Sequence, residues 1–213
     1  MCSRFVGVDW EAVVGFYRAA APGDLALLAE YDGQELFGYD HPEAFIITQL
    51  NPAIARVANW GLLPAWALDN KLQKNTLNGR IETLHEKPMF RDSINNRCLV
   101  PASAFFEHKW SDLNKKNCTK VKHLIKVKDR EMFCFAGLYS EWKGKLTFTI
   151  VTTDANELMS EVHNSKLRMP VILKPEDEAA WLAGVPVSQF ALPYQVELVA
   201  EPILPPPNPG ELF

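Results

Sequence analysis

Hydrophobic and β-branched residues recur along this chain in short runs that are typical of strands. These runs predict strands at Arg4 to Val8, Ala44 to Thr48, Ile54 to Trp60, Arg97 to Val100, Ala104 to Trp110, Val121 to Val127, Met132 to Tyr139 and Leu146 to Thr152. Helical periodicity is confined to a few stretches. The pattern therefore predicts an α+β fold of a single domain, residues 1–213, in which a barrel-like, mostly antiparallel sheet dominates and a few helices flank it.

Capping residues mark the predicted helices. Asp9 precedes a stretch whose apolar residues recur at helical spacing, at Trp10, Val13, Val14 and Tyr17. Asp154 has the position of a second helix cap, and we expect that helix to end near His163. A third helix is predicted to begin at Pro175 and to end before Gly184.

Composition limits the class of protein. The chain has 213 residues, 47% of them hydrophobic, which is enough for one sizeable core. No stretch has the length of an apolar membrane span, and the first residues lack a secretory signal, so we expect a cytoplasmic monomer. Cys98, Cys118 and Cys134 have neither zinc-site spacing nor disulfide density, so we expect reduced thiols, no metal and no cofactor. The proline-rich tail, about 202–213, predicts an extended strap or a mobile end.

Charge is distributed unevenly. The formal net charge is -4. The segment from Lys109 to Lys128 nevertheless carries seven lysines and one aspartate, a balance of +6, which leaves -10 for the remainder. Such a segment can contact nucleic-acid phosphates, but a lysine-rich hairpin is also an ordinary solvated sheet edge. Both interpretations stay open.

Cys2 directly follows Met1, and removal of Met1 would give it two nucleophiles, an α-amine and a thiol. An α-amine, with a pKa of about 7.7 to 8.0, is partly neutral at pH 7 and can attack an aldehyde. The thiol can then add to the imine carbon and close a thiazolidine ring. Alternatively, Cys2 is only a small residue suited to a processed N-terminus or to the core. With Met1 in place, the Cys2 nitrogen is part of a peptide bond.

Glu107 and His163 are candidate acid/base groups. Glu107 lies in an apolar run, and neighbouring Phe side chains would raise its pKa if they remove it from water. His163 falls at the predicted helix end, where the helix dipole favours a protonated imidazole and hence a general acid. A solvated carboxylate and a histidine that only caps the helix are the alternatives.

Two loops offer side chains that recognise rather than react. Asn78-Gly79-Arg80 predicts a turn, in which Asn78 could orient a nucleophile and Arg80 could bind a phosphate with both guanidinium nitrogens. The segment from Trp60 to Ala67 is aromatic and rigid. It suits stacking on exposed bases, although two tryptophans in a buried loop are ordinary core.

The order and the residue sequences of these segments resemble one family, the SOS response-associated peptidase (SRAP) proteins that shield abasic sites in single-stranded DNA. The matching blocks are Met1 to Phe5, Trp60 to Ala67, Asn78 to Thr83, Cys98 to Glu107, and His163 with Arg168 to Leu173. Three features depart from the family pattern. Ser3 replaces the usual Gly, His108 replaces the usual Trp, and the spacing from His163 to Arg168 is longer.

The resemblance implies a role for each matched residue. Cys2 is implied as the crosslinking nucleophile, Asn78 as its positioner, Glu107 as proton-transfer partner and His163 as acid/base toward the sugar. The implied DNA-binding residues are Arg4, Trp60, Trp66, Arg80, Lys166 and Arg168. The implied function is a sensor of abasic sites in single-stranded DNA within the DNA damage response. It forms a covalent thiazolidine after Met1 removal, with abasic-site lyase and self-processing peptidase activity beside it.

Two other functions use the same residues. The first is an N-terminal-nucleophile cysteine peptidase or amidohydrolase, in which the amine is the base for its own thiol. The second is a non-covalent single-stranded DNA-binding module based on the lysine-rich segment and the tryptophans. Turnover of unrelated peptides would indicate the first, and equal affinity for intact and abasic strands would indicate the second.

Overall fold

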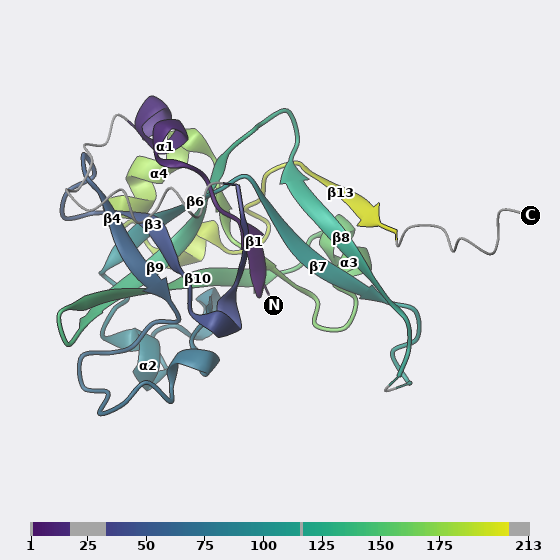
Figure 1. Ribbon diagram of the computed structural model, residues 1–213, viewed down its shortest axis with the longest axis horizontal. Coiled ribbons are helices and arrows are strands. Elements are labelled where there is room, and N and C mark those ends of the chain that lie inside the picture. Colours follow the sequence, from purple (N-terminus) through teal and green to yellow (C-terminus); the bar gives the residue numbers. More distant parts are fainter. Residues whose placement is uncertain (1, 18–32, 116, 205–213) are drawn as a thin grey trace, which may run out of the picture.

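A closed barrel forms the centre of the protein, of which this computed structural model describes residues 2–17, 33–115 and 117–204 (Figure 1). The ring runs through β10 (Lys145–Asp154), β4 (Ala55–Trp60), β3 (Glu43–Thr48), β6 (Arg97–Ala102) and β9 (Phe133–Trp142), which pairs with β10 again. Three short strands extend it, namely β5 (Asn78–Arg80) and β11 (Arg168–Pro170) on β10, and β12 (Ile172–Leu173) on β9. The pairings of β10 with β4 and β5 are parallel, and the others are antiparallel.

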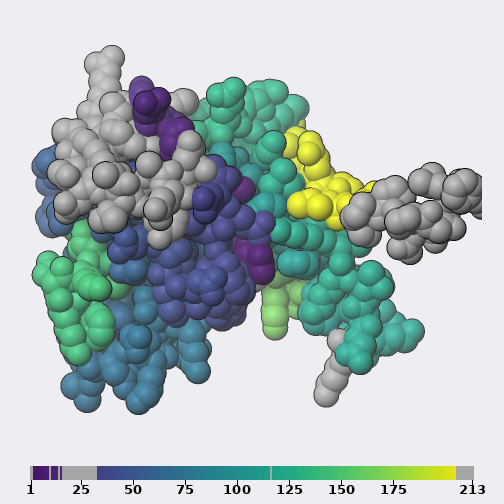
Figure 2. Space-filling model, in the orientation of Figure 1, coloured from purple at the N-terminus to yellow at the C-terminus, as the bar shows by residue number. Residues whose placement is uncertain are grey.

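A second, antiparallel sheet packs against the barrel. Its order is β13 (Leu198–Ile203), β8 (Lys120–Val127), β7 (Ala104–Trp110), β1 (Arg4–Val6) and β2 (Glu35–Phe37). The lysine-rich segment follows the hairpin of β7 and β8, as the sequence predicts. The end of this hairpin stands out from the body of the protein, at the lower right of Figures 1 and 2.

Helices are short and lie outside the sheets (Figure 1). They are α1 (Trp10–Tyr17), α2 (Pro88–Arg91), α3 (Glu157–Val162) and α4 (Pro175–Leu182), with 3-10 turns η3 (Gly38–Asp40), η4 (Gln73–Asn75), η5 (Ile81–Thr83) and η6 (Val187–Phe190). The Asp9 carboxylate accepts a hydrogen bond from the Ala12 amide, which confirms the first cap. The prediction that Asp154 caps the second helix is wrong. Asn156 accepts from the Met159 amide at 2.9 Å, whereas Asp154 is the last residue of β10.

Aromatic side chains fill the space between the barrel and the second sheet. Phe5 of β1 packs edge-on against Trp60 of β4, with ring centroids 5.0 Å apart, and against Phe135 of β9 at 5.8 Å. Phe105 of β7 meets Phe135 from the same side. All four side chains are fully buried. This packing ties β1 into the core and brings Cys2, two residues before β1, into the protein interior.

The predicted strands are confirmed, with ends shifted by a few residues, and so are the α+β class and the single domain. The prediction for Asn78-Gly79-Arg80 is wrong, because these residues form β5 beside β10 rather than a turn. Gly79 packs so closely that a Cβ there would lie 2.7 Å from Leu84. No helix in the described parts of the chain is long and apolar enough to cross a membrane. The proline-rich tail beyond residue 204 lies outside the described residues.

Candidate functional site

Cys2 lies at the bottom of the candidate site, with no exposed surface. Its thiol donates a weak hydrogen bond to the Arg4 carbonyl oxygen, with Sγ and O 3.6 Å apart. Burial raises the pKa of the thiol far above its usual range, and the nearby Glu107 carboxyl raises it further. The thiol of the chain that begins at Met1 is therefore protonated at neutral pH.

Asn78 holds the backbone of Cys2. Its Nδ2 donates to the Cys2 carbonyl oxygen at 2.7 Å. β5 presents Asn78 from the opposite side of the site to β1, because its register on β10 fixes its position. The other amide atom, Oδ1, is buried and has no hydrogen-bond partner among the described residues. A buried acceptor of this kind favours a donor that arrives with a ligand or with processing of the chain.

Glu107 lies in the middle of β7 and is buried, which decides between the solvated and the buried carboxyl that the sequence leaves open. Burial raises its pKa to about 7. The sequence-based expectation of a raised pKa is thus confirmed. A carboxyl with this pKa exchanges protons readily near neutral pH, which suits a general acid or base.

His163 caps the C-terminal end of α3, and its ring faces Glu107. Nε2 lies 3.5 Å from Glu107 Oε2, and both side chains are buried. Nδ1 lies 2.7 Å from the Arg168 carbonyl oxygen, so the neutral ring carries its proton on Nδ1 and a lone pair on Nε2. Burial lowers the pKa of His163 to about 4. The expected protonated imidazole is therefore wrong, because the loss of water outweighs the dipole of so short a helix.

Four chain segments thus bring four residues into one site. Asn78 bonds Cys2, Glu107 acts on the Cys2 thiol, and His163 faces Glu107. The arrangement holds a nucleophile near a carboxyl that is partly ionised at pH 7 and an imidazole that is neutral. Among the described residues, no group of His, Cys, Asp and Glu side chains could hold a metal ion. The chemistry that these residues offer is nucleophilic attack with proton transfer.

Known proteins resemble this chain in sequence. A family model described as SOS response associated peptidase (SRAP) matches residues 1–203. The chain belongs to this family. Abasic site processing protein YoqW from Bacillus subtilis (strain 168) is 46% identical over 129 residues, which cover 58% of this chain and 54% of YoqW. Abasic site processing protein HMCES from Mus musculus is 27% identical over 157 residues, which cover 58% of this chain and 43% of HMCES. The chain thus spans about half the length of these relatives.

Solved structures share the SRAP chain's fold. A crystal structure of a protein from Bacteroides thetaiotaomicron superposes with a TM-score of 0.84 at 29% identity, over 95% of this chain and 92% of that one. A second, from Bordetella bronchiseptica, has a TM-score of 0.75 at 23% identity, over 95% of this chain and 100% of that one. The second likeness concerns the fold alone.

Two of the residues predicted to bind DNA are buried. Trp60 is fully buried in the aromatic core, and its Nε1 donates to the Leu77 carbonyl oxygen at 2.8 Å. It cannot stack on a base, so that prediction is wrong. Because Leu77 directly precedes Asn78, Trp60 instead supports the strand that carries Asn78.

Arg168 is the second buried residue. Its guanidinium donates to Asp154 at 2.6 Å, to Glu82 at 2.8 Å and to the Thr152 carbonyl oxygen at 2.8 Å. A phosphate contact would have to break these bonds, so we leave Arg168 out of the DNA-binding surface. Sequence reasoning missed Glu82 and Asp154 as its partners, since they are far from Arg168 along the chain.

Arg168→Lys should lower the free energy of unfolding by about 2 kcal/mol. A lysine cannot reproduce the forked contact with two carboxylates and a buried carbonyl oxygen, although part of the cluster is solvated. Urea denaturation measures the change, and Arg80→Lys is the matched control because the Arg80 side chain is 56% exposed. Equal stability of the two variants would contradict a structural role for Arg168.

The other DNA-binding candidates lie at the surface. The Trp66 side chain is 51% exposed. Arg4 lies over the Phe37 ring and bonds Glu35, Arg80 makes only distant ion pairs, and Lys166 is exposed. Each charged candidate is close in sequence to a site residue: Arg4 to Cys2, Arg80 to Asn78 and Lys166 to His163. These residues can therefore reach a strand that enters the site.

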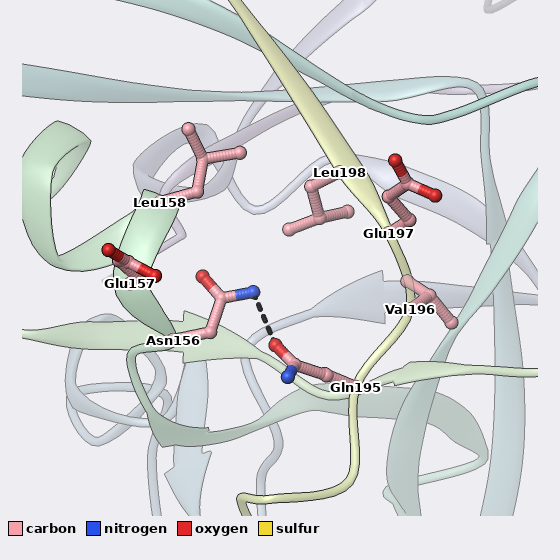
Figure 3. Close-up of a pocket in the computed structure, with 7 residues that line it drawn as sticks. All are labelled: Asn156, Glu157, Leu158, Gln195, Val196, Glu197 and Leu198. Atoms are coloured by element: carbon pink, nitrogen blue, oxygen red, sulfur yellow. Dashed lines mark hydrogen bonds between the residues drawn. The ribbon is translucent and has the colours of Figure 1, made fainter.

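An open groove in the structure lies apart from the candidate site. An open groove of about 450 Å³ lies between the start of α3 and the segment before β13 (Figure 3). Asn156 Nδ2 donates to Gln195 Oε1 there at 2.8 Å, and Glu157 and Glu197 also line the groove (Figure 3). None of the four contacting site residues lines it.

Proposed function

We propose that this chain binds abasic sites in single-stranded DNA and that, after removal of Met1, Cys2 forms a covalent thiazolidine with the lesion. The observation that carries the proposal is the contact of Cys2, Asn78, Glu107 and His163 in one buried site. The names of the related proteins YoqW and HMCES, which call them abasic site processing proteins, support the choice of lesion.

The first step joins the Cys2 amine to the sugar. Once Met1 is gone, the neutral amine attacks the C1′ aldehyde of the ring-opened deoxyribose, and loss of water gives an imine. The amine must lose protons in this sequence. Glu107, with a pKa of about 7, can accept one and return it to the departing hydroxyl group. Asn78 Oδ1 is available to accept a hydrogen bond from the amine.

The second step uses the thiol. Cys2 Sγ adds to the imine carbon, its proton moves to the imine nitrogen, and a five-membered ring closes. One water molecule is released overall. Because burial holds the thiol protonated, the amine acts first. The thiol then reacts with the imine, whose nitrogen can take the thiol proton. His163 Nε2, with its lone pair toward Glu107, can move a proton on the sugar side.

The imine has a second fate. If the thiol does not close the ring, loss of the proton at C2′ expels the 3′ phosphate by β-elimination and cuts the strand. Abasic-site lyase activity is therefore a side reaction of the same intermediate. Removal of Met1 by the chain itself would be the corresponding peptidase activity.

DNA contact in this proposal is independent of base sequence. Arg4, Arg80 and Lys166 meet phosphates, and Trp66 stacks on a base. Affinity should therefore fall with added salt and vary little with the bases around the lesion. The role in the DNA damage response follows from the lesion itself.

Intact mass spectrometry tests the proposal. The purified protein is measured before and after incubation with a single-stranded oligonucleotide that contains one abasic site. The expected protein lacks Met1, and its adduct has the combined mass of protein and DNA minus one water. The adduct survives heating without prior borohydride reduction, and peptide mapping places it on Cys2.

Two outcomes would reject the proposal. A processed protein that turns over unrelated peptides and forms no adduct is a cysteine peptidase. A processed protein that binds intact and abasic strands equally, without a covalent product, is a DNA-binding module.

A further inference from the structure

The loop after His163 carries an amide that bonds the strand bearing Glu107. Asn164 Oδ1 accepts from the Trp110 amide at 3.0 Å, and Asn164 Nδ2 donates to the Trp110 carbonyl oxygen at 2.9 Å. Trp110 is the last residue of β7, and its backbone groups point away from β8 toward this side chain. The Asn164 amide thus occupies the place of one more strand in the sheet.

Contacts within its own segment already fix the His163 ring. The His163 amide donates to the Met159 carbonyl oxygen at 2.7 Å, and the His163 carbonyl oxygen accepts from Leu167 at 3.0 Å. Nδ1 bonds the Arg168 carbonyl oxygen. Leu167 adopts a left-handed backbone, with φ of 53°, which closes the loop tightly. None of these bonds connects His163 to β7, the strand that carries Glu107.

Asn164 connects the loop after His163 to β7. It follows His163 directly, and its partner Trp110 lies three residues after Glu107 on β7. α3 also contacts β7 (Figure 1), and its Met159 and Val162 are buried in the core. The helix therefore docks without Asn164. The loop at its end is bonded to the segment before α3, where the Ala155 amide donates to the Leu167 carbonyl oxygen at 3.0 Å, and the pair of hydrogen bonds from Asn164 to Trp110 ties the loop to β7.

We propose that Asn164 is a positioning residue that holds His163 Nε2 against Glu107 Oε2 by fixing the loop after α3 to the end of β7. Its effect on adduct formation rests on the proposed function, whereas its effect on the His163 environment does not. Proton transfer needs the two heavy atoms about 2.6 to 3.2 Å apart. Nε2 and Oε2 are 3.5 Å apart, so a small approach completes the contact and a small displacement of the loop removes it. The amide limits that displacement.

Asn164→Ala tests this role, with Ser165→Ala in the same loop as the matched control. Asn164→Ala should slow adduct formation on the order of tenfold, because the acid/base pair loses its alignment. Affinity for a strand with a non-reactive tetrahydrofuran abasic analogue should stay within about twofold, since Asn164 makes no proposed DNA contact. Ser165→Ala should match the wild type in both assays. A wild-type rate in Asn164→Ala would overturn the proposal.

An NMR titration separates this proposal from the proposed function. Burial is the main cause of the lowered pKa of His163; the charged N-terminus, Lys166 and His108 lower it further, and the bond to the Arg168 carbonyl oxygen raises it. The Glu107 carboxyl faces the ring at 3.5 Å. If Asn164→Ala releases the loop, water reaches the ring and the His163 pKa rises toward 6.5. An unchanged His163 titration, with only a lower melting temperature, would overturn the positioning role. This comparison decides the matter even if the wild type forms no adduct.

Discussion

Cys2→Ala abolishes the heat-stable DNA adduct while strand cleavage at the abasic site persists. Alanine at the processed N-terminus keeps the amine, so the imine still forms, but no sulfur is present to close the ring. The imine then hydrolyses or undergoes β-elimination. Denaturing gel electrophoresis of the reaction, heated with and without prior borohydride reduction, measures both products. The expected adduct of the variant appears only after reduction.

Cys118→Ser is the matched control, because Cys118 is a partly exposed thiol that is distant from the N-terminus in sequence. This variant should form as much adduct as the wild type. A heat-stable adduct of Cys2→Ala without reduction would place the crosslink on another residue and reject the thiazolidine.

Glu107→Gln should lower the rate of adduct formation by about 10² to 10⁴. Glutamine keeps the size of the side chain but cannot take a proton from the amine. The wild-type rate should rise with pH in two overlapping steps, as Glu107 ionises near its pKa of about 7 and as the α-amine becomes neutral near its pKa of about 7.7 to 8.0. The variant should lose the first step and keep the second. Single-turnover rates between pH 5 and 8.5 provide the measurement.

Stability gives an independent check on the same carboxyl. The folded state raises the pKa of Glu107 from 4.5 to about 7, so between these values the folded chain binds more protons than the unfolded chain. Its contribution to the free energy of unfolding therefore falls as pH rises from 4.5 to 7, by roughly 3 kcal/mol at most. Glu107→Gln removes this pH-dependent decrease in the free energy of unfolding.

The variant should consequently gain stability relative to wild type as pH rises from 5 to 8. His163 acts in the opposite direction. Folding lowers its pKa from 6.5 to about 4, so its contribution to the free energy of unfolding increases as pH rises between those values. The two shifts largely offset each other in the wild type. A stability difference between Glu107→Gln and wild type that does not change with pH would contradict the raised pKa of Glu107.

Local sequence was sufficient for the strands and for most of the helix signals. The runs around Phe5, Phe105 and Phe135 predict strands because alternate residues must be buried, and the same residues form the core. Glu107 could be named in advance as a candidate, but an apolar run in a strand leaves open whether its carboxyl is solvated or buried. The structure decides for the buried position. Asp154 was misassigned because an acid three residues before Glu157 resembles a cap, whereas Asn156 makes the bond.

The turn prediction for Asn78-Gly79-Arg80 failed for a similar reason. Asn-Gly favours a left-handed turn in isolation, but a parallel pairing with β10 holds the segment extended. The pairing joins residues more than seventy positions apart, and no local pattern reveals such a contact. The same pairing aims Asn78 at the backbone of Cys2.

Exposure was the property that sequence could not assign. Trp60 and Trp66 lie in one aromatic segment, yet Trp60 is buried and Trp66 is half exposed. Gly61 separates them with φ of 110°, a backbone that turns the chain out of β4. Arg168 resembled a phosphate ligand, but carboxylates from two other segments surround it.

The sequence by itself determined which residues are candidates for the chemistry, because Cys2, Asn78, Glu107 and His163 could be identified by residue type and motif. Only the tertiary structure decided how these groups behave. Burial sets the Glu107 pKa near 7, keeps the Cys2 thiol protonated and makes His163 neutral rather than cationic. The physical reason is that the cost of charge depends on the loss of water, which packing between distant segments creates and which no single segment encodes.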